Sequence, residues 1–109
     1  MGPEARAALI AGLDHPNAKV RWWCLPLMDP LADASYLEPI LTKLSDPVGK
    51  VRRHAIHALS CGACKPDRRR LAVDIEAALR GVVARDPDAK VRAEALDALA
   101  ALGFAPSQR

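Results

Sequence analysis

The chain has 109 residues, a formal net charge of +3, and a composition that is half hydrophobic with only four aromatic residues. This length allows one domain, and an apolar fraction rich in alanine and leucine favours packed helices over β-sheets. The small positive charge neither requires nor excludes nucleic acid as a ligand, because binding depends on basic residues clustered on one face.

The sequence does not look like that of a membrane or secreted protein. No run approaches the roughly 20 apolar residues of a membrane-spanning helix. The N-terminus carries Glu4 and Arg6 and lacks the organisation of a signal peptide. Three cysteines, two of them in a CxxC pair, do not suit a secreted disulfide framework. We therefore expect a soluble cytoplasmic protein.

A seven-residue pattern occurs three times along the chain: HPNAKVR at 15–21, DPVGKVR at 46–52 and DPDAKVR at 86–92. An amphipathic stretch precedes each copy, at 5–13, 36–44 and 75–83, and another follows, at 20–28, 51–59 and 91–99. The spacing of apolar residues in these stretches is helical. Asp or Asn beside Pro closes a turn and caps the next helix. The pattern therefore predicts three units, each a helix, a tight turn and a second helix.

These units resemble the HEAT-repeat family, in particular the short bacterial repeats of the phycobilin-lyase type. The resemblance lies in a turn Asp followed by Val-Arg: Asp46 precedes Arg52 and Asp86 precedes Arg92, each by six residues. Asp14 precedes Arg21 by one more residue, because His15 intervenes. The resemblance implies an all-α fold, an α-solenoid of three repeats at approximately 3–29, 33–61 and 67–103 with about six helices.

The resemblance also implies the role of two further features. In this family the turn Asp and the Arg of neighbouring repeats form a polar ladder inside the stack. Arg21, Arg52 and Arg92 are therefore expected to be structural rather than a nucleic-acid-binding stripe. Pro39 lies where the family often kinks the first helix of a repeat.

Aligning the units on Val20, Val51 and Val91 predicts which residues of the second helices are buried. Four sets of apolar positions are expected in the core: Cys24/Ala55/Ala95, Leu25/Ile56/Leu96, Leu27/Ala58/Ala98 and Met28/Leu59/Leu99. Cys24 is interpreted as inert packing. Pro26 should end or bend its helix early.

The positions pointing away from that core define a predicted groove, lined by Trp22, Trp23 and Pro26, then Arg53, His54 and His57, then Ala93, Glu94 and Asp97. Exposed tryptophans are good anchors for a partner. The alternative for Trp22 and Trp23 is packing under the first helix or against each other. For the histidines and carboxylates, charge pairing across the groove is favoured over a divalent-metal site.

A cysteine motif follows the second unit. His54, His57 and Cys61 share one helical face, and Cys64 follows after Gly62, which gives the donor types of a zinc site. A redox role for the CxxC pair is a second alternative. Structural thiols remain the favoured interpretation.

Beyond the cysteines lies a basic segment that contains Lys65, Arg68, Arg69 and Arg70. If these residues lie at the start of a helix, their charges and the helix dipole would both stabilise a bound phosphate or acidic peptide. A solvated charge cluster on the loop between units is the favoured alternative.

The sequence thus favours a non-catalytic protein-interaction or scaffold module without a cofactor, whose partner is another protein or peptide. One alternative is a nucleic-acid- or phosphate-binding protein that uses Lys50, Arg53, Lys65 and the three arginines 68–70. Another is a metal- or redox-active protein centred on His57, Cys61 and Cys64. Both ends of the solenoid look uncapped, so either residues 1–13 and 103–109 cover them or the protein forms a homodimer through those ends, and the homodimer is the favoured prediction.

Overall fold

The computed structural model describes residues 3–29, 34–60 and 72–104, and within these ranges every regular element is a helix. The first helix pair is α1 (Pro3–Gly12) and α2 (Ala18–Cys24), the second is α3 (Leu37–Thr42) and α4 (Gly49–Ser60), and the third is α5 (Ala72–Arg85) and α6 (Ala89–Ala101). Short 3-10 segments lie at Leu25–Leu27, Ala34–Tyr36 and Lys43–Ser45. No helix of the described residues is both long and apolar enough to cross a membrane.

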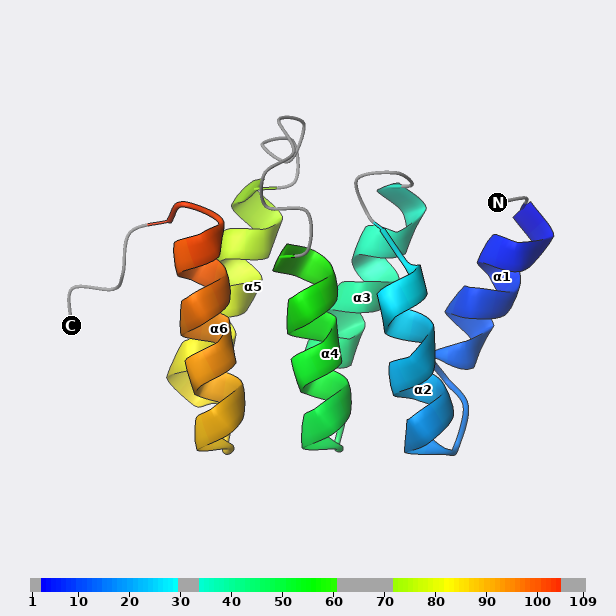
Figure 1. Ribbon diagram of the computed structural model, residues 1–109, viewed down its shortest axis with the longest axis horizontal. Helices are drawn as coiled ribbons and strands as arrows, with labels where there is room; N and C mark the ends of the chain where they lie inside the picture. Colours follow the sequence, from blue (N-terminus) through cyan, green and yellow to red (C-terminus); the bar gives the residue numbers. More distant parts are fainter. Residues whose placement is uncertain (1–2, 30–33, 61–71, 105–109) are drawn as a thin grey trace.

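The helices form two rows: α2, α4 and α6 lie side by side, α3 and α5 lie behind them, and α1 lies beside α2 at the N-terminal end of the second row (Figure 1). Within the first row α2 contacts α4 and α4 contacts α6, while each helix of the second row contacts the helix that follows it in the chain. The resulting body measures 43 × 31 × 16 Å. Successive helices of the first row therefore present one continuous face.

Local sequence explains where the helices of the first row begin and end. Asn17 and Asp88 cap α2 and α6, since their side chains accept the backbone N–H groups of Lys19 and Lys90. As predicted, α2 stops early: it ends at Cys24, and the chain continues through Pro26 as a 3-10 segment.

The region around Pro39 differs from the single helix predicted over 36–44. The α-helical part is limited to Leu37–Thr42, with a 3-10 segment on each side. Pro39 lies in the first turn of α3, where its missing N–H leaves no bond within the helix unmade. The proline therefore limits where α-helix can begin instead of kinking a longer helix.

The core lies between the two rows and follows the predicted register at most positions. Fully or nearly fully buried positions include Leu25, Ile40, Val51, Ala55, Ile56, Leu59, Ile75, Leu79, Val91, Ala95 and Leu99. Two of the residues predicted in the core are instead exposed, Leu27 by 60% and Leu96 by 44%. Leu27 is displaced by the change to 3-10 geometry after Cys24. Leu96 is exposed because no further helix packs beside α6 among the described residues.

Candidate functional site

The predicted groove residues lie on α2, α4 and α6 and belong to the face described above (Figure 1). Trp22, Arg53, His54 and Glu94 are half-buried, whereas Trp23, His57 and Asp97 are exposed. The structure thus brings the predicted residues together on one row of helices. It also separates those that contact a neighbouring helix from those that remain accessible.

The first contact across this face joins α2 to α4. The Trp22 ring stacks on the His54 imidazole with 6.2 Å between ring centroids and 24° between planes. The Lys50 ammonium lies 4.3 Å from the centre of the Trp22 ring, which is a cation–π geometry. His54 is held on its other side, where Nδ1 lies 2.9 Å from the carbonyl oxygen of Lys50. The Trp22 ring is therefore packed between α2 and α4, in contact with His54 and Lys50.

The second contact joins α4 to α6 through the ion pair of Arg53 and Glu94, whose closest nitrogen and oxygen atoms are 3.0 Å apart. The hydrogen bond and the charge of Glu94 raise the pKa of Arg53 above its ordinary value. The two side chains are 42% and 38% exposed, so the pair lies at the surface and contributes at most about 1 kcal/mol. The sequence predicts charge pairing between the histidines and the carboxylates, whereas the structure pairs Glu94 with Arg53 and stacks His54 on Trp22.

Two hollows open beside this ion pair. One, of about 260 Å³, lies between α4 and α6 and includes His57, Ser60 and Asp97 in its lining. The other, of about 220 Å³, includes Lys50, His54 and His57. His57 borders both hollows, and Glu94 does so as well. The accessible polar groups of the face therefore gather around His57.

Trp23 has a different environment from Trp22. It is 64% exposed, and Leu27, four residues later, is also largely exposed. In the alignment of the units Trp23 corresponds to His54 and Glu94, each of which is contacted by the preceding helix of the row. Among the described residues α2 is the first helix of its row, so Trp23 has no such neighbour in that row and is left exposed.

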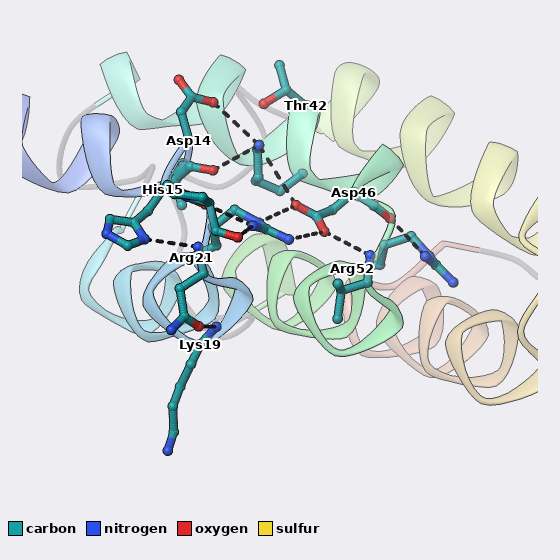
Figure 2. A network of polar contacts seen from close by, with 12 residues as sticks. Asp14, His15, Lys19, Arg21, Thr42, Asp46 and Arg52 are labelled. Carbon is teal, nitrogen blue, oxygen red and sulfur yellow. Dashed lines mark hydrogen bonds and ion pairs between the residues drawn. The ribbon is translucent and has the colours of Figure 1, made fainter.

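A polar network connects the turns of successive units (Figure 2). Arg21 donates from Nε and Nη2 to the two carboxylate oxygens of Asp46, at 2.9 and 3.1 Å. Arg52 donates in the same way to Asp86, at 2.7 and 3.2 Å. These are the contacts between neighbouring units that the resemblance implies for Arg21 and Arg52. Their side chains are 11% and 10% exposed, so they do not form an accessible basic stripe.

Asp46 is the most heavily engaged carboxylate of this network. Burial raises its pKa, but hydrogen bonds from Arg21 and the Val48 N–H and the charges of Arg21 and Lys43 outweigh that effect. The net result is a pKa below the ordinary value of 3.8. Asp46 is therefore ionised at neutral pH and closes both its own turn and the contact to the preceding unit.

The first turn corrects the expected equivalence of Asp14. His15 stands where Asp46 and Asp86 stand: its Nδ1 accepts the N–H of Asn17 at 3.0 Å, and its carbonyl oxygen accepts Arg21 Nη1 at 2.8 Å. Asp14 lies outside this arrangement, with its side chain 84% exposed and 3.6 Å from Lys43 (Figure 2). It cannot close the turn as Asp46 does, because the residue two positions later is a proline without an N–H.

The predicted metal, redox and anion-binding residues Cys61, Cys64, Lys65, Arg68, Arg69 and Arg70 lie outside the described residues. Within the described ranges, no group of three or more histidine, cysteine or acidic side chains is arranged to hold a metal ion. The third cysteine, Cys24, is half-buried against the core, and burial raises the pKa of its thiol. This agrees with its interpretation as packing.

One cleft was not anticipated from the sequence. It has a volume of about 560 Å³ and lies between α3 and α5, with Leu41, Ala77, Ala78 and Gly81 on its walls and Arg52 and Asp86 among its polar lining. Three small residues on α5 are the only sequence signal for it.

Comparisons with known proteins add no assignment to this geometry, since no family model, curated protein or solved structure matches the chain.

Proposed function

We propose that the three helix pairs are HEAT-type repeats of a short α-solenoid, and that this solenoid is a non-catalytic protein-interaction module. The face of α2, α4 and α6 would bind a segment of a partner protein. Three units with the same turn and the repeated contact between Arg21 or Arg52 and the next aspartate support the solenoid. The continuous row of second helices supports the choice of face.

The exposure of Trp23 is the observation that carries this proposal. A large rigid aromatic side chain gains more from desolvation than most others, and tryptophan is enriched among residues that dominate interfaces. Trp22 beside it is fixed by His54 and Lys50, so it offers a rigid wall instead of a mobile side chain. A partner would place an apolar side chain against Trp23 and Leu27.

The remainder of the face provides polar contacts. His57 and Asp97 are exposed and line the hollows, whereas Arg53 and Glu94 neutralise one another. The proposed partner segment therefore has an apolar group at the α2 end and hydrogen-bonding groups toward α6. The pairing of Arg53 with an acidic residue also makes this face less suitable for nucleic acid, where phosphate contacts dominate affinity.

Selection from a random peptide library on the immobilised protein tests this proposal. Wild type should enrich a family of related peptides, and Trp23→Ala should weaken their binding about 30-fold, the effect of losing about 2 kcal/mol at an interface anchor. Leu96→Ala is the matched control, because Leu96 is also a large exposed apolar residue but is not one of the groove residues of α6. Peptides that bind wild type and Trp23→Ala equally would contradict the proposal.

A metal- or redox-active centre at His57, Cys61 and Cys64 remains a separate prediction from the sequence. Elemental analysis of protein purified without a histidine tag tests the metal version, for which stoichiometric zinc is the expected result.

A further inference from the structure

The polar contact that joins successive units stays incomplete at the third arginine. Arg92 donates from Nη1 to the carbonyl oxygen of Asp86 at 2.7 Å, just as Arg52 donates to that of Asp46 at 2.8 Å. Arg21 and Arg52 also place Nε and Nη2 on a carboxylate of the next unit. Among the described residues, no carboxylate pairs with these two donors of Arg92. The Arg92 guanidinium is therefore oriented by its own turn through Nη1. Its Nε and Nη2, together called the fork below, have no carboxylate to donate to among the described residues.

An apolar position beside Arg92 is incomplete in the same way. Leu25 and Ile56 are 0% and 2% exposed, because the next helix pair covers them. Leu96 is their counterpart on α6 and is 44% exposed. The alanines that share its side of the helix, Ala89, Ala93 and Ala100, are exposed as well. The outer side of α6 thus carries the same two features, an arginine fork and an apolar residue, that the interior of the row uses to hold a following unit.

The opposite end of the molecule does not complement this surface. His15 replaces the carboxylate that Asp46 and Asp86 offer to the preceding arginine. An imidazole has no pair of acceptor oxygens for a guanidinium fork, and its Nδ1 already accepts the Asn17 N–H. The neighbouring carboxylate of Asp14 lies beside Lys43 at 3.6 Å. A second copy of the chain therefore cannot supply the missing group in the geometry used inside the molecule.

We propose that the outer side of α6, formed by Arg92 and Leu96, docks a helical hairpin of a different polypeptide whose turn presents an aspartate. His15 would keep a second copy of this chain off that surface. This proposal is an alternative to the homodimer through uncapped ends that the sequence predicts. The choice of partner follows from charge complementarity, since Arg21 and Arg52 show which group the fork takes and at what distance. The proposal uses the stacking of units but not the face that carries Trp23.

The chain itself supplies the probe. His15→Asp restores the carboxylate at the position where Asp46 and Asp86 have it, and should convert the protein into one that associates head to tail. Sedimentation velocity should show wild type as a monomer up to about 100 μM, and His15→Asp as a species whose sedimentation coefficient increases with concentration over that range. His15→Asn is the matched control, because it keeps a side-chain oxygen for the turn but lacks the second oxygen and the charge, and it should remain monomeric.

A second variant separates this surface from others. His15→Asp combined with Arg92→Ala should be monomeric alone, since its fork is gone, but should form a 1:1 complex with wild type, which has the fork and lacks the aspartate. Circular dichroism establishes that each variant is folded. The proposal is overturned if folded His15→Asp stays monomeric, or if association persists in the double variant. Association of wild type that Arg92→Ala abolishes would overturn the role given to His15. None of these outcomes bears on peptide binding by the Trp23 face, because that assay uses no variant of His15 or Arg92.

Discussion

Removal of the Arg52 side chain tests whether the ladder between units is a main source of stability. Arg52 and Asp86 are 10% and 3% exposed and share two hydrogen bonds, and Arg52 also donates to the carbonyl oxygen of Asp46. Arg52→Ala leaves the Asp86 carboxylate buried, and among the described residues the Asp88 N–H is its remaining hydrogen-bond donor. Leaving one charge of a buried pair uncompensated costs about 3–5 kcal/mol. That is a large part of the roughly 5–15 kcal/mol that stabilises a domain.

Urea unfolding followed by far-UV circular dichroism at neutral pH measures this loss. The matched control is Arg53→Ala, one residue along the same helix, whose pair with Glu94 is about two-fifths exposed. Its removal should change the free energy of unfolding by no more than about 1 kcal/mol. The expected result is therefore a clear separation between two adjacent arginines on α4.

A double-mutant cycle assigns the effect to the pair. Arg52→Ala, Asp86→Ala and the combination should give a coupling free energy of about 1–3 kcal/mol, because the second truncation removes the charge that the first left unpaired. Asp86→Ala also loses the acceptor for the Asp88 N–H, which adds about 1 kcal/mol to that variant alone. Equal losses for Arg52→Ala and Arg53→Ala, or strict additivity in the cycle, would refute the reasoning.

Three further predictions concern other residues. Because the pKa of Asp46 is lowered, its contribution to stability is complete at neutral pH and is lost as the pH falls through its lowered folded-state value; Asp46→Asn should therefore lower stability at neutral pH and flatten its decline below about pH 4, as followed by urea unfolding across pH. Trp22→Ala should lower the free energy of unfolding by about 1–3 kcal/mol through loss of the stack and the cation–π contact, whereas Trp23→Ala should change it by less than about 0.5 kcal/mol. In a variant that lacks the other two cysteines, Cys24 should be alkylated more slowly than free cysteine at neutral pH, because its raised pKa lowers the thiolate fraction; equal rates would contradict this.

The helices, the turns and the register of the core could be predicted because they depend on local rules repeated three times. In each unit a residue directly before a proline and six positions before an arginine marks the turn and the start of the next helix; that residue is aspartate in the second and third units and histidine in the first. The early end of α2 at Cys24 follows from Pro26 in the same way. These local signals are reliable because the same pattern occurs at the same place in all three units.

The exceptions arise where burial depends on a neighbour. Leu96 has the same position in its helix as the buried Ile56 and is equally apolar, so no local signal distinguishes them. Only the position at the end of the row makes Leu96 exposed. The alignment of Asp14 with Asp46 and Asp86 was wrong for a different reason, because here the sequence contains the necessary signal. Asp46 and Asp86 each stand directly before a proline, and the residue directly before Pro16 is His15.

Contacts across the face could not be predicted as pairs, although their residues could. Trp22 meets His54 and Arg53 meets Glu94 at equivalent places between successive helices. One contact is an aromatic stack and the other an ion pair. The buried contacts between units, by contrast, use an arginine and an aspartate both times.

This difference follows from solvent access. A buried guanidinium must be matched by a carboxylate in good geometry, because an unpaired buried charge is very costly. At half-exposed positions water satisfies whatever the pair does not, so many combinations give similar stability. The buried contacts therefore constrain how units stack, and the chemistry of the face is free to differ from unit to unit. Selectivity for the proposed partner is therefore expected to come from these variable surface groups, in particular Trp23, His57 and Asp97.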